Sequence, residues 1–205
     1  MPNSLPANAK SKSAYHHGDL RAALIREGLR QLEAGAVAEL SLRGLAKGAG
    51  VSGSAPYRHF PDKAALLEAI AAEGYRRVAA VVAPSGVRIG EAARRMASFA
   101  EQHGAWWELM VAGGPSVGAE LEEARGGLLT ELVGAVERSG SGAGHAPDEA
   151  IRIAVAVWAL VVGLARLRAG GGVALLDEAM VPDPAVLAES LVSGRSMPRA
   201  GAPRP

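Results

Sequence analysis

The sequence predicts an all-α protein with about nine or ten helices, divided between a small N-terminal three-helix unit and a larger helical C-terminal domain. Apolar residues recur at the i, i+3, i+4 spacing of helices along most of the chain, and Gly, Pro and Ser interrupt these stretches. No segment predicts a strand. A glycine turn between two short apolar stretches near residue 50 indicates that two N-terminal helices meet at a tight corner.

Length and composition are those of an ordinary globular protein. The 205 residues are 49% hydrophobic and 21% charged, and they include no cysteine, which excludes disulfides and thiolate metal sites. The longest apolar stretch, Ile153–Leu167, is interrupted by Gly163 and ends in Arg166 and Arg168, so it predicts a buried helix and no membrane segment. The N-terminus lacks an apolar signal core. We therefore expect a cytoplasmic protein without a cofactor.

Charge is unevenly distributed along the chain. Residues 1–64 hold nine Lys or Arg against five Asp or Glu, whereas the remaining residues hold thirteen against sixteen. A modestly basic N-terminal third favours a polyanionic partner such as nucleic acid. His16 and His17 are adjacent, but neighbouring helix residues point in different directions and no third ligand lies nearby in the sequence, so we expect no metal site.

Breaks in the apolar pattern divide the chain into five segments. Residues 1–17 form a basic arm that we expect to be flexible, with its lysines either on phosphate or in solvent. Residues 18–64 hold the three-helix unit, whose first helix begins at Gly18 or Asp19 and ends near Ala34. Residues 65–83 continue a connector helix over Ala64–Val82. Residues 84–195 form the larger domain, and residues 196–205 form a tail that we expect to be disordered.

The larger domain is expected to be helical throughout. Glycine, proline and serine mark the boundaries, and Ser139–Ala146 has the composition of a linker. The expected helices are Ile89–Gln102, His103–Val111, Val117–Ser139, Pro147–Ala169 and a last helix starting within Pro182–Pro184.

The segment Ser41–Lys63, SLRGLAKGAGVSGSAPYRHFPDK, predicts two short helices joined by a tight turn. Ser41 can N-cap the first helix, and the glycines that follow it tolerate the left-handed backbone of a sharp reversal. Ser52 or Ser54 then caps a second helix that runs through Phe60. A helix-turn-helix of this kind places its second helix in the major groove of DNA.

The start of the second helix depends on Pro56. If Ser52 is the cap, Pro56 is the fourth helical residue and forfeits the first intrahelical hydrogen bond; if Ser54 is the cap, the missing N–H costs nothing. We therefore expect a helix that starts late or loosely. Gly53 and Ala55 leave few side chains for direct base contacts, so DNA shape can contribute to recognition.

The order of residues in this segment resembles the N-terminal DNA-binding domain of TetR-type transcriptional repressors, over about residues 18 to 75. The matching residues are Ala46, Ala49-Gly50-Val51-Ser52, Tyr57-Arg58-His59-Phe60 and Lys63. An unrelated helical hairpin would explain the apolar members of this set as core, but it would leave exposed Tyr57, Arg58 and Lys63 without a purpose. The resemblance implies binding to double-stranded operator DNA.

The DNA-binding candidates divide into two kinds of contact. The resemblance implies that Ser41 and Arg43, like Tyr57 and Lys63, contact the DNA backbone, which positions the protein without reading sequence. Residues of the second helix can also reach phosphate through exposed amides or meet base edges. The full set of candidates is Ser41, Arg43, Ser52, Gly53, Ser54, Ala55, Tyr57, Arg58, His59 and Lys63.

Aromatic and apolar residues of the larger domain are candidates for a ligand pocket. Trp106 and Trp107 are adjacent and cannot both face one core, so we expect one of them to border a cavity or an interface. The segment Trp158–Leu164 resembles the Trp-His-Gly segment that names one TetR C-terminal domain, with Val162 at the usual histidine position. The alternative is that the candidates only fill the helical core. They are Phe99, His103, Trp106, Trp107, Met110, Leu128, Leu132 and Trp158.

The resemblance implies a homodimer whose interface lies on the last two long helices, Pro147–Ala169 and Pro184–Ser193. We therefore expect a DNA-binding repressor that a small, largely apolar effector releases from its operator. A DNA-binding activator or architectural protein without a pocket is the alternative. A helical enzyme is disfavoured, because the one dense acid group, Glu120, Glu122 and Glu123, spreads around the outside of a helix.

Overall fold

The computed structural model describes residues 17–35, 37–113, 118–140, 146–171 and 181–193, and these residues form eight α-helices, two short 3-10 helices and no strand. The predicted all-α fold is therefore confirmed, and the helical elements number ten when the 3-10 helices are included. The expected arm over residues 1–16, most of the expected linker near residue 143 and the expected tail lie outside the described residues.

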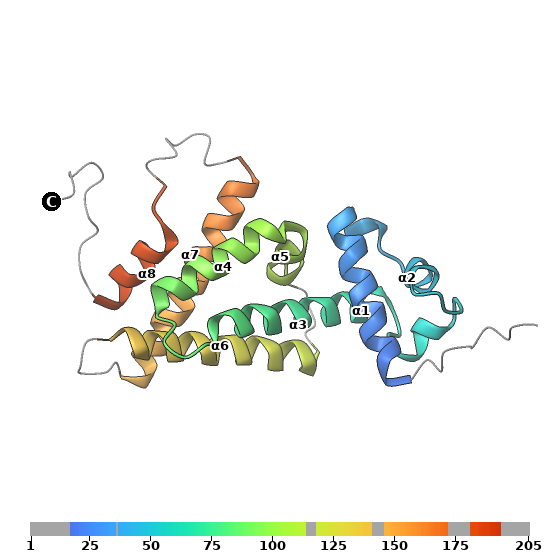
Figure 1. Cartoon of the computed structure of the whole chain (residues 1–205), viewed down its shortest axis with the longest axis horizontal. Helices are drawn as coiled ribbons and strands as arrows, with labels where there is room; N and C mark the ends of the chain where they lie inside the picture. Colours follow the sequence, from blue (N-terminus) through green and yellow to red (C-terminus); the bar gives the residue numbers. More distant parts are fainter. Residues whose placement is uncertain (1–16, 36, 114–117, 141–145, 172–180, 194–205) are drawn as a thin grey trace, which may run out of the picture.

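The N-terminal elements gather at one end of the molecule (Figure 1). They are α1 (His17–Ala34), a 3-10 helix η1 (Val37–Glu39), α2 (Leu42–Gly48) and a second 3-10 helix η2 (Ala55–Arg58). Leucines at helical spacing on α1 are buried and pack with those of α2 in one apolar core. We call α1, α2, η2 and the first turns of α3 the head.

The connector helix α3 (Lys63–Val82) belongs to both halves of the molecule. Asp62 caps it, because its side chain accepts a hydrogen bond from the amide of Ala65 at 2.8 Å. Its first half packs on α1, where a Cβ at Gly28 would lie 2.6 Å from Ile70 Cδ1, so the two helices touch closely. Its second half runs alongside α6 (Figure 1). Because α3 is one unbroken helix, the head and the larger half share a rigid element.

The larger half consists of five helices. α6 (Ala119–Ser139) lies along α3, α4 (Ile89–Gln102) packs on α8 (Pro184–Ser193), and α7 (Pro147–Ala169) contacts α4, α6 and α8. α5 (Gly104–Val111) is short and fills the space between α3, α4 and the head (Figure 1). The predicted bounds of Ile89–Gln102 and Pro147–Ala169 are confirmed.

Both tryptophans of α5 are buried, which corrects the expectation that only one of them faces the core. Trp106 and Trp107 are each 1% exposed. The indole Nε1 of Trp106 donates a 2.9 Å hydrogen bond to the carbonyl of Ile70 in α3. Trp107 instead packs on Trp158 of α7, with 5.2 Å between the ring centroids. Adjacent residues can both be buried here because α5 is enclosed by helices on more than one side.

One face of α7 is apolar and exposed. Ile151, Val155 and Leu167 are between 43% and 50% exposed, and Ala159 and Gly163 are exposed between them. Among the described helices, α7 alone is long and apolar enough to cross a membrane, judged by length and composition only. Only 22% of its most apolar 18-residue stretch is buried within this chain. This face therefore lacks a partner within the described part of the chain.

Candidate nucleic-acid interface and ligand cavity

The corner after α2 follows the predicted turn. Gly50 has a φ of +70°, and its amide donates a 3.2 Å hydrogen bond to the carbonyl of Lys47. The amide of Val51 donates a 2.9 Å hydrogen bond to the carbonyl of Ala46. This pair of hydrogen bonds around a left-handed glycine is a Schellman motif. Val51 packs against the buried core of the head. The turn thus fixes the direction in which the chain leaves α2 toward η2.

The second motif helix is shorter than expected. We predicted a helix from Ser52 or Ser54 through Phe60, whereas the structure contains a single 3-10 helix, Ala55–Arg58. Ser54 occupies the N-cap position, so the helix starts late, but its hydroxyl bonds no amide and lies 3.3 Å from that of Ser52. Pro56 lies in the first turn and has no N–H to donate. Little chain then remains before the second proline, Pro61, which disfavours helical geometry in the residue before it.

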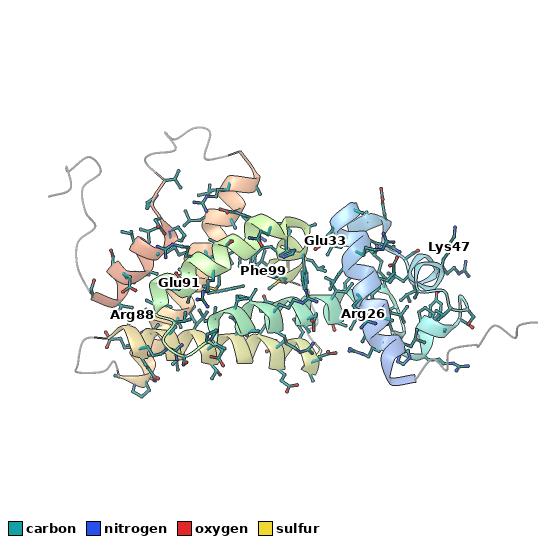
Figure 2. All side chains as sticks on the ribbon, viewed as in Figure 1. Arg26, Glu33, Lys47, Arg88, Glu91 and Phe99 are labelled. Atoms are coloured by element: carbon teal, nitrogen blue, oxygen red, sulfur yellow. The ribbon has the colours of Figure 1, made fainter. Side chains whose placement is uncertain are left out.

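Most of the predicted DNA-binding residues are exposed at the end of the molecule far from α7 and α8 (Figure 1). Arg43 and Arg58 are exposed, Tyr57 is 49% exposed, and His59 is half-buried. Figure 2 shows the neighbouring Lys47 pointing outward from α2. The exposed predicted residues at this end are Ser41, Arg43, Ser52, Gly53, Ser54, Tyr57 and Arg58.

Two of these candidates already have partners within the chain. The hydroxyl of Ser41 accepts a 3.1 Å hydrogen bond from the amide of Gly44 and so caps α2. The ammonium group of Lys63 donates a 3.0 Å hydrogen bond to the carbonyl of Ala38 in η1. An ammonium has three donors, so Lys63 keeps two for a phosphate oxygen.

The charge on this surface is mainly positive. Residues 41–63 contain four basic side chains, and Asp62 is their one acidic residue. The side chain of Asp62 is occupied as the cap of α3. The guanidinium of Arg21 in α1 lies over the ring of Phe60, with Cζ 5.3 Å from the ring centroid. This cation–π contact holds the segment after η2 against α1. The surface therefore suits a polyanion such as the DNA backbone.

A carboxylate holds the head to the larger half. Glu120, in the first turn of α6, accepts hydrogen bonds from Arg21 of α1 and from Arg76 of α3, each at 2.5 Å. Burial raises the pKa of the Glu120 carboxyl, but the hydrogen bond from Arg76 and the charge of Arg21 outweigh that effect and leave the pKa below its ordinary value. We call this arrangement the Glu120 bridge.

A second polar contact crosses the same boundary near α5. His103, between α4 and α5, has its Nδ1 3.1 Å from Glu33 Oε1 at the end of α1. Figure 2 labels Glu33 on the side of α1 that faces α5. His103 was predicted to line a ligand pocket, and in the structure its imidazole contacts Glu33 of the head.

A cavity of about 320 Å³ lies between α3, α6 and α7. Three of the predicted ligand-binding residues line it: Leu128, Leu132 and Trp158. The prediction omitted four further lining residues, which are Tyr75, Arg125, Leu129 and Val155. Tyr75 and Arg125 carry no local signal of a pocket, because the cavity forms only when α3, α6 and α7 are brought together.

The remaining ligand candidates lie elsewhere. Trp106, Trp107 and Met110 are each 1% exposed and pack in the core, and Phe99 lines a separate groove between α3 and α4. A row of aromatic contacts nevertheless joins them to the cavity, since Tyr75 and Trp107 both pack on Trp158, with centroid distances of 5.7 and 5.2 Å. Trp107 has a further property: among the described residues, its Nε1 is the one buried side-chain nitrogen or oxygen that lacks a hydrogen bond.

The fold and the surface of the head define a helix-turn-helix DNA-binding protein, and comparison with known proteins identifies its family. Residues 24–70 match the family of bacterial regulatory proteins called tetR, and residues 89–194 match the tetracyclin repressor-like C-terminal domain. A protein of unknown function from Rhodococcus sp. RHA1 is 34% identical, with a TM-score of 0.69; the match covers 89% of this chain and 98% of that chain. The chain belongs to the TetR family of DNA-binding transcriptional regulators.

More distant structures share the fold. A TetR-family transcriptional regulator from Streptomyces coelicolor is 23% identical with a TM-score of 0.57, and the match covers 86% of this chain and 78% of that one. A TetR variant from Acinetobacter baumannii AYE in complex with minocycline is 21% identical with a TM-score of 0.61, covering 84% of this chain and 94% of that one. A search of curated proteins finds no significant match.

Proposed function

We propose that this protein is a dimeric, cytoplasmic repressor that leaves its operator when a small, largely apolar ligand enters the cavity between α3, α6 and α7. The observation that carries this proposal is that α6 contacts both the cavity and the head. Its residues from Arg125 to Leu132 line the cavity, and its Glu120 accepts a hydrogen bond from Arg21 of the head. A ligand that moves α6 therefore changes how the head is held. Family membership supports a role in transcription that is not enzymatic.

The head is proposed to grip DNA mainly through its backbone. Arg43 in α2 and Tyr57 and Arg58 in η2 are exposed, while Gly53 has open space around it and offers no side chain. The short η2 presents few side chains to a groove. Phosphate contacts position a protein without specifying sequence, so recognition is proposed to draw on DNA shape as well.

The dimer interface is proposed to lie on the exposed apolar face of α7, together with α8. The small residues Ala156, Ala159 and Gly163 form the middle of that face, and larger side chains flank them, including Val155 and Leu167. Small residues allow a second helix to approach closely, and a partner copy would bury the flanking side chains. Two heads are required because a two-fold operator presents half-sites one helical turn apart.

The proposal is tested by measuring binding to the DNA upstream of the protein's own gene by fluorescence anisotropy at several salt concentrations. Tyr57→Ala with Arg58→Ala should weaken binding to every duplex and flatten its salt dependence, because fewer counterions are released. Arg94→Ala, which removes an exposed arginine of α4, is the matched control. Unchanged affinity and salt dependence in the double variant would contradict the assignment of the head.

The ligand-release step needs its own measurement. Operator binding by the wild-type protein should weaken when a ligand fills the cavity, and Leu132→Trp, which fills the cavity with protein, should abolish the response to the ligand. If no ligand changes the operator affinity of the wild-type protein, the alternative of an activator or architectural protein is favoured.

A further inference from the structure

We infer that the cavity between α3, α6 and α7 takes an apolar molecule with one anionic group, a carboxylate in the simplest case, and that the guanidinium of Arg125 binds this group. The inference rests on the proposed function, since it names the chemical class of the effector. Among the described residues that line the cavity, Arg125 alone is charged. The other lining residues are Tyr75, Leu128, Leu129, Leu132, Val155 and Trp158.

Arg125 is held at the cavity wall with donors to spare. Its side chain is 29% exposed, and its Cζ lies 5.5 Å from the ring centroid of Tyr75, which also lines the cavity. The nearest acidic partner is Glu122, whose Oε1 lies 3.6 Å from Arg125 Nη1 and whose side chain is 62% exposed. An ion pair at that distance whose carboxylate is exposed to solvent contributes little, and a guanidinium has five N–H donors.

Charge complementarity selects an anion over other ligands. A cationic ligand would meet the guanidinium with no acidic side chain among the lining residues to offset it. A ligand without any polar group would cover Arg125 and leave its donors desolvated, which is unfavourable. A carboxylate restores those hydrogen bonds, and its two oxygens match the planar fork of arginine.

The remaining lining residues determine which apolar group the ligand carries. Tyr75 and Trp158 form an aromatic wall with ring centroids 5.7 Å apart, and leucines of α6 supply the remainder. A flat ring or a branched aliphatic group packs well on such a surface. The volume of about 320 Å³ lies at the small end of the range of about 300 to 1,000 Å³ for ligand sites. One guanidinium and one apolar body therefore describe a small monocarboxylate, and they exclude a polyphosphate.

The test compares two probes of nearly identical shape by isothermal titration calorimetry on the full chain: 2-naphthoate and its neutral amide, 2-naphthamide. The wild-type protein should bind the carboxylate about tenfold to a hundredfold tighter than the amide, as expected for hydrogen bonds to a charged group. Arg125→Gln should remove this preference and leave the affinity for the amide unchanged. Arg125→Lys, which keeps the charge without the fork, should retain part of the preference.

Two further variants separate a binding role of Arg125 from a structural one. Glu122→Gln removes the competing carboxylate and should leave the naphthoate affinity equal or higher. Arg94→Gln makes the same charge change on α4 and should alter neither affinity. Circular dichroism of each variant establishes that the fold is intact.

Each outcome decides between the inference and the proposed function. Equal wild-type affinity for the two probes, a preference that survives Arg125→Gln, or no binding of naphthoate overturns the inference. Operator release by both probes alike preserves the proposed function while removing the inference. Naphthoate binding through Arg125 without any change in operator affinity preserves the inference and contradicts ligand-driven release.

Discussion

Glu120 in α6 accepts a 2.5 Å hydrogen bond from Arg21 in α1, which lies ninety-nine residues earlier in the chain. The same carboxylate accepts a hydrogen bond from Arg76 of α3, so three helices meet at one side chain. α6 lines the cavity only a few residues further on, at Arg125. The cavity is therefore connected to the head through the backbone of α6 and the hydrogen bond between Glu120 and Arg21. A shared element of this kind can couple two sites when it has two arrangements.

The Glu120 bridge predicts a pH dependence of stability. Because the pKa of Glu120 is lowered in the folded protein, its contribution to the free energy of unfolding is present above the ordinary value of 4.5 and is lost as the pH falls below it. Glu120→Gln should therefore be less stable than wild type at pH 7, by about 1 kcal/mol or less since the pair is partly exposed. Urea unfolding between pH 7 and pH 3 measures this, and parallel curves for the two proteins would contradict it.

A second prediction concerns Gly74, where α3 and α5 touch. A Cβ at this position would lie 2.7 Å from Trp106 Nε1 and would also meet Met110. Gly74→Ala should destabilise the protein by about 1 to 3 kcal/mol through overpacking. Gly126→Ala is the matched control in α6, because nothing lies within 4 Å of its added Cβ, and it should stabilise by about 0.5 to 1 kcal/mol. Thermal unfolding of both variants measures the difference, and equal effects would refute the close packing.

A third prediction concerns the turn between α2 and η2. Gly50 has a φ of +70° with open space around it, so a side chain there meets strain and no clash. Gly50→Ala should lower the free energy of unfolding by about 1 to 2 kcal/mol. Gly53→Ala, also in open space, should change it by about 0.5 kcal/mol or less. Chemical denaturation measures both values, and an equal effect at the two positions would show that the left-handed backbone is unimportant.

A fourth prediction concerns assembly. Ala159 is exposed at the centre of the apolar face of α7, so Ala159→Glu is compatible with a folded monomer but places a charge in the proposed interface. Sedimentation at micromolar concentration should show a dimer for wild type and a monomer for this variant, with weaker operator binding because the two heads are no longer linked. Ala119→Glu, at an exposed position at the start of α6, should remain a dimer. A monomeric wild-type protein would refute the interface.

Local signals in the sequence predicted much of the fold. Pro147 in the first turn and Gly170 after the last turn bound α7 as expected, because proline and glycine act on the backbone of their own residues. Pro56 likewise led us to expect a helix that starts late, although η2 proved shorter than expected. The two tryptophans of α5 were harder to predict, since their burial depends on helices that enclose α5 from several sides.

The sequence by itself determined the all-α fold, the helix-turn-helix corner and the family, because helical periodicity, turn glycines and motif residues are properties of neighbouring positions. Only the tertiary structure decided that Tyr75 and Arg125 share a cavity, that Glu120 joins α6 to Arg21, and that His103 meets Glu33. The two residues in each of these pairs lie between 50 (Tyr75 to Arg125) and 99 (Arg21 to Glu120) positions apart in the chain. Which helix faces meet is set by the packing of the whole core, and a local pattern does not contain that information.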